Sequence, residues 1–223
     1  MQKNLIVFAV LAITQVISWG AVGILPVLAS SIAGDLGIAL PTVFFGASTM
    51  FVTMGLAAPA AGRAFRRYGA RRVMAAGAAL VACGLTLIAA SVTTLMFLAA
   101  WVIMGAAGAM LLTTGAYIYL SDFAEEQARS LIGTLMLVTG LSSALFFPVT
   151  AFLASTIGWR GAVLTYAGVM LLVVAPLVFG GLPETATAPK AAEPNPAPSS
   201  KGTSVFWLIV VAVALNSFAP FGS

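Results

Sequence analysis

The residues of this sequence that could bind a small molecule are polar side chains placed inside long apolar segments. Gln15 and Trp19 are four positions apart in the first segment, and Thr113 and Tyr117 have the same spacing in a later one. Side chains four apart lie on one face of a helix, so each segment presents a small polar patch. Polar groups inside a membrane are costly unless they are bonded, so these patches are candidates for the lining of a solute cavity. The candidate cavity residues are Gln15, Ser18, Trp19, Thr113, Tyr117, Thr139 and Ser143.

A structural role is the alternative for each of these residues. Ser and Thr in membrane helices commonly bond to their own backbone or link neighbouring helices, which applies to Thr113, Thr139 and Ser143. Gln15 is more expensive to leave without a partner than a hydroxyl group is. Trp19 lies too deep in its segment for the aromatic belt at a membrane surface, which favours a cavity lining. The residue types alone leave both roles open.

The sequence lacks the residue types that catalysis or the binding of a metal ion or cofactor would require. It contains no His, and Cys83 is its single Cys, so it has neither a His-ligated metal or haem site nor a disulfide framework. A Ser nucleophile without a base is not a catalytic site, so we do not expect an enzyme. The basic residues gather in one loop without interleaved aromatic residues, and no nucleic-acid partner is expected.

Long apolar segments must position the polar patches. Hydrophobic residues make up 61% of the chain and charged residues 7%, against roughly 45–50% and about 25% in a soluble domain. A lipid bilayer is therefore the expected solvent, and about 20 residues are needed to cross it. The sequence predicts an all-α membrane protein with helices near residues 5–29, 41–61, 73–92, 95–120, 131–156 and 161–181, followed by the start of a seventh helix.

Charged residues are absent from the interior of these six expected spans. Proton coupling needs a titratable group in the pathway, and an organic anion usually needs a cation there. Either further polypeptide supplies that charge, or the solute is neutral or amphipathic.

An arginine cluster between the second and third spans predicts the topology. It holds half of the ten basic residues of the chain. Because such loops stay on the cytoplasmic side, the N-terminus is expected in the cytoplasm, with Asp35 and Arg160 as the only charged residues on the opposite side. The cluster is either a topology signal alone or the hinge of a transporter. Its residues are Gly62, Arg63, Arg66, Arg67, Gly69, Arg71 and Arg72.

Three parts follow one another along the chain. Residues 1–182 are expected to form the six-helix bundle, and residues 183–203 a cytoplasmic linker rich in Pro, Ala and Ser. Residues 204–223 form the seventh helix, which looks like the beginning of an incomplete second half, so we expect a truncated chain. The tripeptides at 69–71 and 158–160 open the third and sixth spans from opposite sides, which is the pattern of two inverted three-helix repeats.

The arginine cluster, together with motifs in the later spans, resembles the N-terminal half of a major facilitator superfamily transporter. The family's loop between spans two and three places glycines and basic residues as Gly62 to Arg72 do here. The resemblance extends over nearly the whole chain, and it implies that spans one, four and five line a central cavity. The other matching positions are Gly105, Gly108, Gly140, Pro148, the tripeptide 158–160 and the tripeptide 182–184.

Departures from the family pattern affect its conformational lock and its charges. Arg66 stands where relatives have an Asp that engages the other half, and Trp101 stands where an Arg is common. The acids following the fourth span are either a solvated turn or an ionic latch to the arginine cluster that breaks as the cavity opens inward. The residues of this latch would be Asp122, Glu125, Glu126 and Arg129.

The resemblance implies a secondary transporter in a bacterial cytoplasmic membrane, with a small-molecule substrate, the lipid bilayer and a missing C-terminal half as partners. Residues 35–37 are similar to the monocarboxylate-porter-like group, which would imply a small organic anion moved with a proton or in exchange. Efflux of neutral or amphipathic compounds remains open. So does a channel, or a membrane fragment or partner subunit that does not transport by itself.

Overall fold

The computed structural model describes residues 2–124 and 127–184, and within these ranges the chain is helical without any β-strand. Glu125, Glu126, most of the expected linker and the expected seventh helix lie outside the described residues. The helices are α1 (Gln2–Val22), α2 (Leu25–Leu36), α3 (Leu40–Tyr68), α4 (Ala70–Ala89), α5 (Thr94–Leu111), α6 (Thr113–Ala124), α7 (Ala128–Gly140), α8 (Ser142–Val169), the π-helical η2 (Met170–Val174) and α9 (Ala175–Gly181).

These helices join into five apolar runs that are long enough to cross a membrane. The first run combines α1 and α2, the fourth combines α5 and α6, and the fifth extends from α7 to α9. The apolar segments expected within residues 5–181 therefore correspond to these five runs, but their division into helices differs from the prediction. The five runs are Leu5–Leu36, Leu40–Tyr68, Ala70–Ala89, Thr94–Ala124 and Ala128–Gly181.

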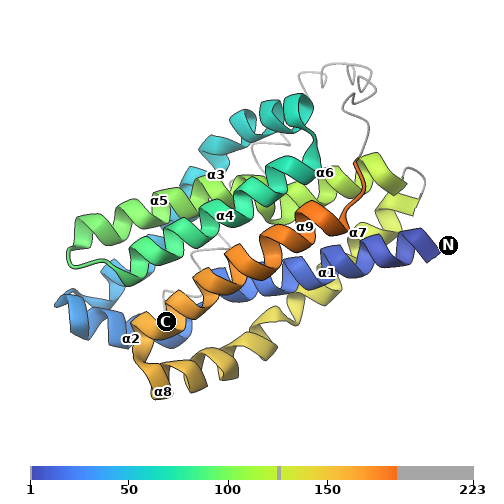
Figure 1. Cartoon of the computed structure of the whole chain (residues 1–223). Helices are drawn as coiled ribbons and strands as arrows, with labels where there is room; N and C mark the ends of the chain where they lie inside the picture. The colour runs from blue at the N-terminus through green and yellow to red at the C-terminus, as the bar shows by residue number, and fades with distance from the viewer. Residues whose placement is uncertain (1, 125–126, 185–223) are drawn as a thin grey trace, which may run out of the picture. The chain divides into compact units, whose positions relative to one another are not determined.

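The fifth run turns back on itself at Gly158. Its 54 residues would extend to about 80 Å as one straight helix, more than twice the thickness of a bilayer core. Gly158 has φ 74° and ψ 166°, a conformation that is almost exclusive to glycine, inside the range assigned to α8. Figure 1 shows the chain reversing its direction within α8, so that the segment leading to α9 runs back along α4.

The arginine cluster is helical, and our expectation of a loop there was wrong. α3 continues through Arg66 and Arg67 to Tyr68, and α4 begins at Ala70, so only Gly69 separates them. Ala and Arg are strong helix formers, and cations in the last turn complement the negative end of the helix dipole. Gly69 has φ 81°, which permits the change of direction between the two helices.

α5 packs along both α3 and α4, and small residues allow the close approach. A Cβ atom added at Gly46 of α3 would lie 2.6 Å from the ring of Trp101 in α5. A Cβ atom added at Gly105 would meet the backbone oxygen of Met50. The buried Trp101 ring also makes an edge contact with Phe97, at 6.1 Å between centroids. This contact therefore depends on glycines rather than on polar bonds.

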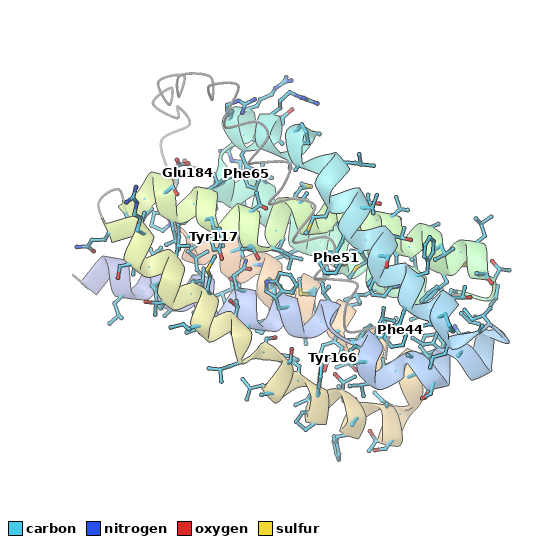
Figure 2. All side chains as sticks on the ribbon, turned by 180° about the vertical axis from the view of Figure 1, so that it is seen from behind. Phe44, Phe51, Phe65, Tyr117, Tyr166 and Glu184 are labelled. Carbon is cyan, nitrogen blue, oxygen red and sulfur yellow. The ribbon has the colours of Figure 1, made fainter. Side chains whose placement is uncertain are left out.

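Polar clusters tie the helices together at the two ends of α4. At its start, Arg71 and Arg72 bind Glu184 at 2.7 and 3.2 Å. At its end, Arg160 donates to the backbone oxygens of Ala89 and Ser91. Figure 2 shows Glu184 and Phe65 at one end of the bundle and Phe44 toward the other. The middle of the bundle lies between these two clusters.

Candidate functional site

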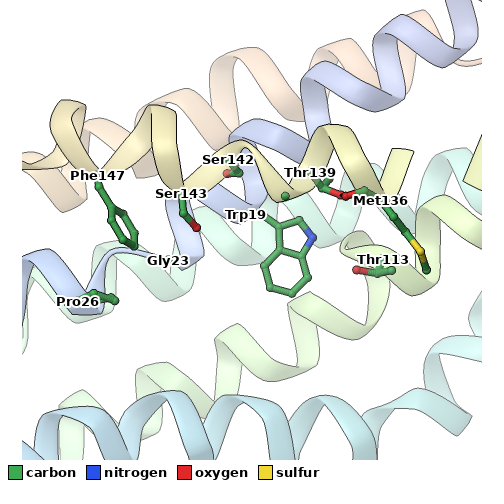
Figure 3. A pocket seen from close by; sticks show the side chains of 10 residues that line it. Trp19, Gly23, Pro26, Thr113, Met136, Thr139, Ser142, Ser143 and Phe147 are labelled. Atoms are coloured by element: carbon green, nitrogen blue, oxygen red, sulfur yellow. The ribbon is translucent and has the colours of Figure 1, made fainter. Parts of the chain in front are cut away.

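A cavity of about 430 Å³ lies among α1, α2, α6, α7 and α8. Figure 3 shows the Trp19 indole in the middle of its lining, between Thr113 and Ser143. Hydroxyl groups, aromatic rings and a thioether surround the space, and none of the lining side chains is charged. The lining residues are Trp19, Gly23, Pro26, Thr113, Met136, Thr139, Gly140, Ser142, Ser143 and Phe147.

Four of the seven candidate residues line this cavity. Trp19 comes from the first run, Thr113 from the fourth, and Thr139 and Ser143 from the fifth. Polar patches that are about a hundred positions apart in the sequence therefore face one space. Their role in binding a solute stays a prediction.

The other three candidates have different surroundings. Gln15 and Ser18 are buried, with at most 1% of their surface exposed. Gln15 donates from Nε2 to the backbone oxygen of Leu111 at 2.8 Å, and Ser18 donates from Oγ to Thr14 at 2.6 Å. Tyr117 is half-buried and lies outside the set of lining residues. Gln15 and Ser18 thus have bonds of the structural kind that we weighed as the alternative.

Lining the cavity and bonding to the backbone do not exclude one another. Thr139 donates to the backbone oxygen of Leu135 at 2.6 Å, while Ser142 donates to that of Val16 at 2.7 Å, across to α1. A hydroxyl group that donates its proton still offers lone pairs to a second partner. Both residues can therefore accept a hydrogen bond from a solute without giving up their own bonds.

All three runs that line the cavity have a local break beside it. Regular helix gives way to a turn at Gly23 between α1 and α2, to extended backbone at Leu112 between α5 and α6, and to a turn with near-helical φ and ψ at Leu141 between α7 and α8. The predicted spans 5–29, 95–120 and 131–156 contain these breaks within continuous apolar runs. Irregular backbone at membrane depth is tolerated where it lines a cavity or is buried in protein, so the three interruptions agree with the position of this cavity.

Six of the ten lining residues were not among the seven candidates. They are Gly23, Pro26, Met136, Gly140, Ser142 and Phe147. Phe147 is four positions after Ser143 and so shares its helix face. Its apolar side chain could not be told from those that face lipid. Gly23 together with Pro26 was the available signal for an interrupted first span, because both residues weaken a helix interior.

The arginine cluster is tied to the segment that follows α9. Arg71 also donates to the backbone oxygen of Leu182 at 3.5 Å, and its guanidinium carbon lies 5.0 Å from the centre of the Phe179 ring. Tyr119 donates to the backbone oxygen of Pro183 at 3.0 Å. α4, α6 and the segment at the end of α9 are thereby joined at this end, and Glu184 is an acidic partner that the sequence reasoning did not pair with the arginines.

The predicted latch stays a prediction. Ion pairs between described residues include neither Asp122 nor Arg129, while Glu125 and Glu126 lie outside the described residues. In this conformation Glu184 occupies two arginines that a latch could use.

The charged residues of the opposite end bind one another. Asp35 Oδ2 accepts hydrogen bonds from Trp159 Nε1 and Arg160 Nε, both at 3.0 Å. Because Arg160 also bonds to Ala89 and Ser91, one guanidinium group connects the end of the first run, the end of α4 and the turn at Gly158. The sequence placed Asp35 and Arg160 on one side but did not predict that they pair.

A second cavity, of about 470 Å³, lies between α4 and the part of the chain that follows Gly158. Its lining is almost entirely aliphatic and contains the exposed Cys83. Thr86, its one hydroxyl residue, donates to its own helix at Ala82. This space offers little to orient a polar solute, so the cavity around Trp19 is the better candidate site.

The family model of the Major Facilitator Superfamily matches residues 11–222, which include every residue that lines the cavity. No curated protein matches the chain. With its five apolar helical runs, the match makes the chain a multi-pass membrane protein, and it points to a secondary transporter rather than an enzyme. The chain belongs to the Major Facilitator Superfamily.

Proposed function

We propose that this chain forms part of a secondary transporter that moves a neutral or amphipathic solute through the cavity around Trp19 by alternating access. The observation that carries the proposal is the lining itself, which combines hydroxyl groups with aromatic rings and contains no charged side chain. Trp19 and Phe147 provide surface for an apolar body, and the Ser and Thr hydroxyls can bond to its polar groups. Family membership supports the transport cycle.

An organic anion fits this lining less well. A carboxylate that enters the membrane without a partner is strongly disfavoured, and relatives of this kind of site supply a cation or the positive end of a helix. Arg71, Arg72 and Arg160 are held at the two ends of α4, in bonds to Glu184 and Asp35. The other described arginines, Arg63, Arg66, Arg67 and Arg129, do not line the cavity either, so transport of an anion would require a cation from outside its described lining.

The proposal includes six spans within residues 1–182. Gly158 would divide the fifth run into two, and the two three-helix halves would be inverted repeats. The N-terminus and the arginine cluster would face the cytoplasm of a bacterial cell. Residues 183–203 would be the linker, and residues 204–223 would begin a second helical unit.

The remaining wall of the cavity would come from a partner helical unit or from another copy of the chain. The described helices leave the cavity open, and large apolar side chains are exposed on the helices beside it. Among them are Phe44 and Phe51 of α3, Leu141, and Leu145 of α8 (Figure 2 labels the two phenylalanines). Such a surface can face either lipid or a second helical unit, and the open cavity favours the second unit on this side.

A matched pair of solutes tests the substrate class. Phenyl glucoside and phenyl glucuronide have the same shape, but only the second has a carboxylate. We expect protein-dependent flux of the labelled glucoside into vesicles to exceed that of the glucuronide by about tenfold or more, because the lining offers no cation. Ser143→Ala and Trp19→Ala should reduce this flux, while Thr49→Ala should not, because Thr49 is bonded to its own helix at Phe45. Faster flux of the glucuronide would contradict a neutral substrate.

A further inference from the structure

The break in the fourth run is held by a side chain from the first. α5 ends at Leu111 and α6 begins at Thr113, with Leu112 between them at φ −66° and ψ −152°. A helix end leaves the carbonyl groups of its last turn without intrahelical donors. Gln15 Nε2 donates to one of them, the backbone oxygen of Leu111, at 2.8 Å. The bond joins two residues that are 96 positions apart in the sequence.

Packing alone does not explain an amide at this position. The Gln15 amide must turn its nitrogen toward Leu111, because its oxygen would repel another carbonyl oxygen. Its own oxygen then faces away, and it is buried without a donor among the described residues. A buried acceptor without a partner destabilises the folded state, and an aliphatic side chain of similar size would avoid that penalty. The bond to Leu111 is therefore the feature that accounts for the amide.

The hydrogen bond from Gln15 to Leu111 is close to Thr113, the residue of the fourth run that lines the cavity. Thr113 follows Leu112 directly and lines the cavity opposite Ser143 (Figure 3). Rotation of the backbone at Leu112 would change the direction of the Thr113 side chain. The neighbouring interruption at Leu141 has a similar tie, because Ser142 Oγ donates to the backbone oxygen of Val16. Adjacent residues of α1 thus hold both interrupted runs.

We propose that Gln15 is a positioning residue of the cavity. Its amide fixes the geometry of the break at Leu112 and thereby the direction in which the Thr113 hydroxyl faces the solute. This inference rests on the proposed function, since the direction of Thr113 matters to transport only if the cavity takes a solute. The geometry of the break can nevertheless be measured without any solute.

Thiol labelling in the full-length chain tests the inference. Cysteines are introduced one at a time as Thr113→Cys and Ser143→Cys in a Cys83→Ala background, and their rates of reaction with N-ethylmaleimide are compared in membrane vesicles. We expect Gln15→Met, which keeps the size but cannot donate, to change the ratio of the two rates by about fivefold or more. Thr14→Val is the matched control. Thr14 is buried in the same helix and bonds only to its own turn at Leu11, so this change should leave the ratio as it was.

Gln15→Glu separates bonding from packing. A protonated carboxyl group can donate to Leu111, whereas a carboxylate can only accept. The ratio should be close to that of the parent at about pH 5, where the carboxyl group can donate, and should approach that of Gln15→Met wherever the group is ionised. The parent with native Gln15, measured over the same pH range, gives the reference for the titration of the two thiols themselves.

Several outcomes would overturn the inference. An unchanged ratio in Gln15→Met would do so, and so would an equal change in Thr14→Val, which would indicate a general packing effect of α1. If Gln15→Met does not reach the membrane, a ratio in Gln15→Glu that departs from that of the parent as much at about pH 5 as at about pH 9 is decisive against it. Failure of the proposed function has a different signature, because flux of the phenyl glucoside would then be absent while the labelling ratio would still respond to Gln15→Met.

Discussion

Trp101 is the largest of the fully buried side chains of the described residues, and its position explains how α3 and α5 approach each other. The resemblance to the superfamily implies an Arg at this place in many relatives. Here an indole fills the space against Gly46, and its Nε1 is buried without a partner among the described residues. The fourth run therefore has neither a cation near its middle nor a polar bond to α3 through this residue. Close packing must stabilise the contact instead.

Gly46→Ala is expected to destabilise the protein by about 1–3 kcal/mol, because the added methyl group would overlap with the Trp101 ring. The matched control is Gly55→Ala in the same helix, where a Cβ atom would have no neighbour within 4 Å. There the substitution should be neutral or slightly stabilising, as alanine is the better helix former. Thermal unfolding of both variants in detergent, followed by circular dichroism, measures the difference. Equal melting temperatures would show that α3 and α5 are not this close.

Helical spacing in the sequence predicts which single residues share a helix face, but not what they contact on another helix. Spacing and polarity predicted polar helix faces that include Trp19, Thr113, Thr139 and Ser143. These four residues line the cavity. Gln15 lies on a predicted polar face as well, but its partner is a carbonyl group that is free only because α5 ends at Leu111. Local spacing does not reveal a break in another helix, so that bond could not be predicted.

Interruptions are the feature that distinguishes the helices of this protein from simple apolar rods. Three of them surround the cavity, and a fourth, at Gly158, turns the fifth run back. The tripeptide that begins at Gly158 was recognised in the sequence as the start of a span, and the positive φ gives a physical reason for glycine there. The interruption at Leu112 has no such signal, since leucine is an ordinary helix former, whereas the one at Leu141 directly follows Gly140. Hydrogen bonds to α1 accompany both of these breaks, because Gln15 donates to Leu111 and Ser142 donates to Val16.

Gly158→Ala should destabilise the protein by about 1–3 kcal/mol, since φ 74° with ψ 166° is a conformation that side chains with a Cβ atom rarely adopt. No atom would lie within 4 Å of the new methyl group, so the effect would come from backbone strain alone. Gly168→Ala, in the regular helix of the same run, also meets no neighbour and serves as the control. Chemical unfolding in detergent micelles compares the two. A stability loss in the control as large as that in Gly158→Ala would contradict the strained turn.

On the scale of the whole bundle, the ion pairs between described residues lie at its two ends. At one end Glu184 joins Arg71 and Arg72, and at the other Asp35 joins Arg160. Each cluster also bonds to backbone oxygens, so both ends are fastened while the middle contains the cavity and the interrupted helices. The order of residues in the sequence predicted this arrangement, because the charged residues fall outside the apolar segments. It could not predict the partners, which meet only when distant helices lie side by side.

The separation of charge predicts the orientation of the protein in the membrane. With the arginine cluster on the cytoplasmic side, a cysteine introduced as Tyr68→Cys in the Cys83→Ala background should not react with a membrane-impermeant maleimide in intact cells. Gly34→Cys, beside Asp35, should react, and the space around it is open because no atom lies within 4 Å of its Cβ position. Both sites should react after the cells are opened, which controls for buried thiols.

Each arginine disfavours transfer across the membrane by about 2.5–3.5 kcal/mol at its centre, so the arginine cluster would stay on the same side of the membrane in every molecule. Reaction at position 68 with silence at position 34 would invert the topology, and it would place the Glu184 cluster outside the cell.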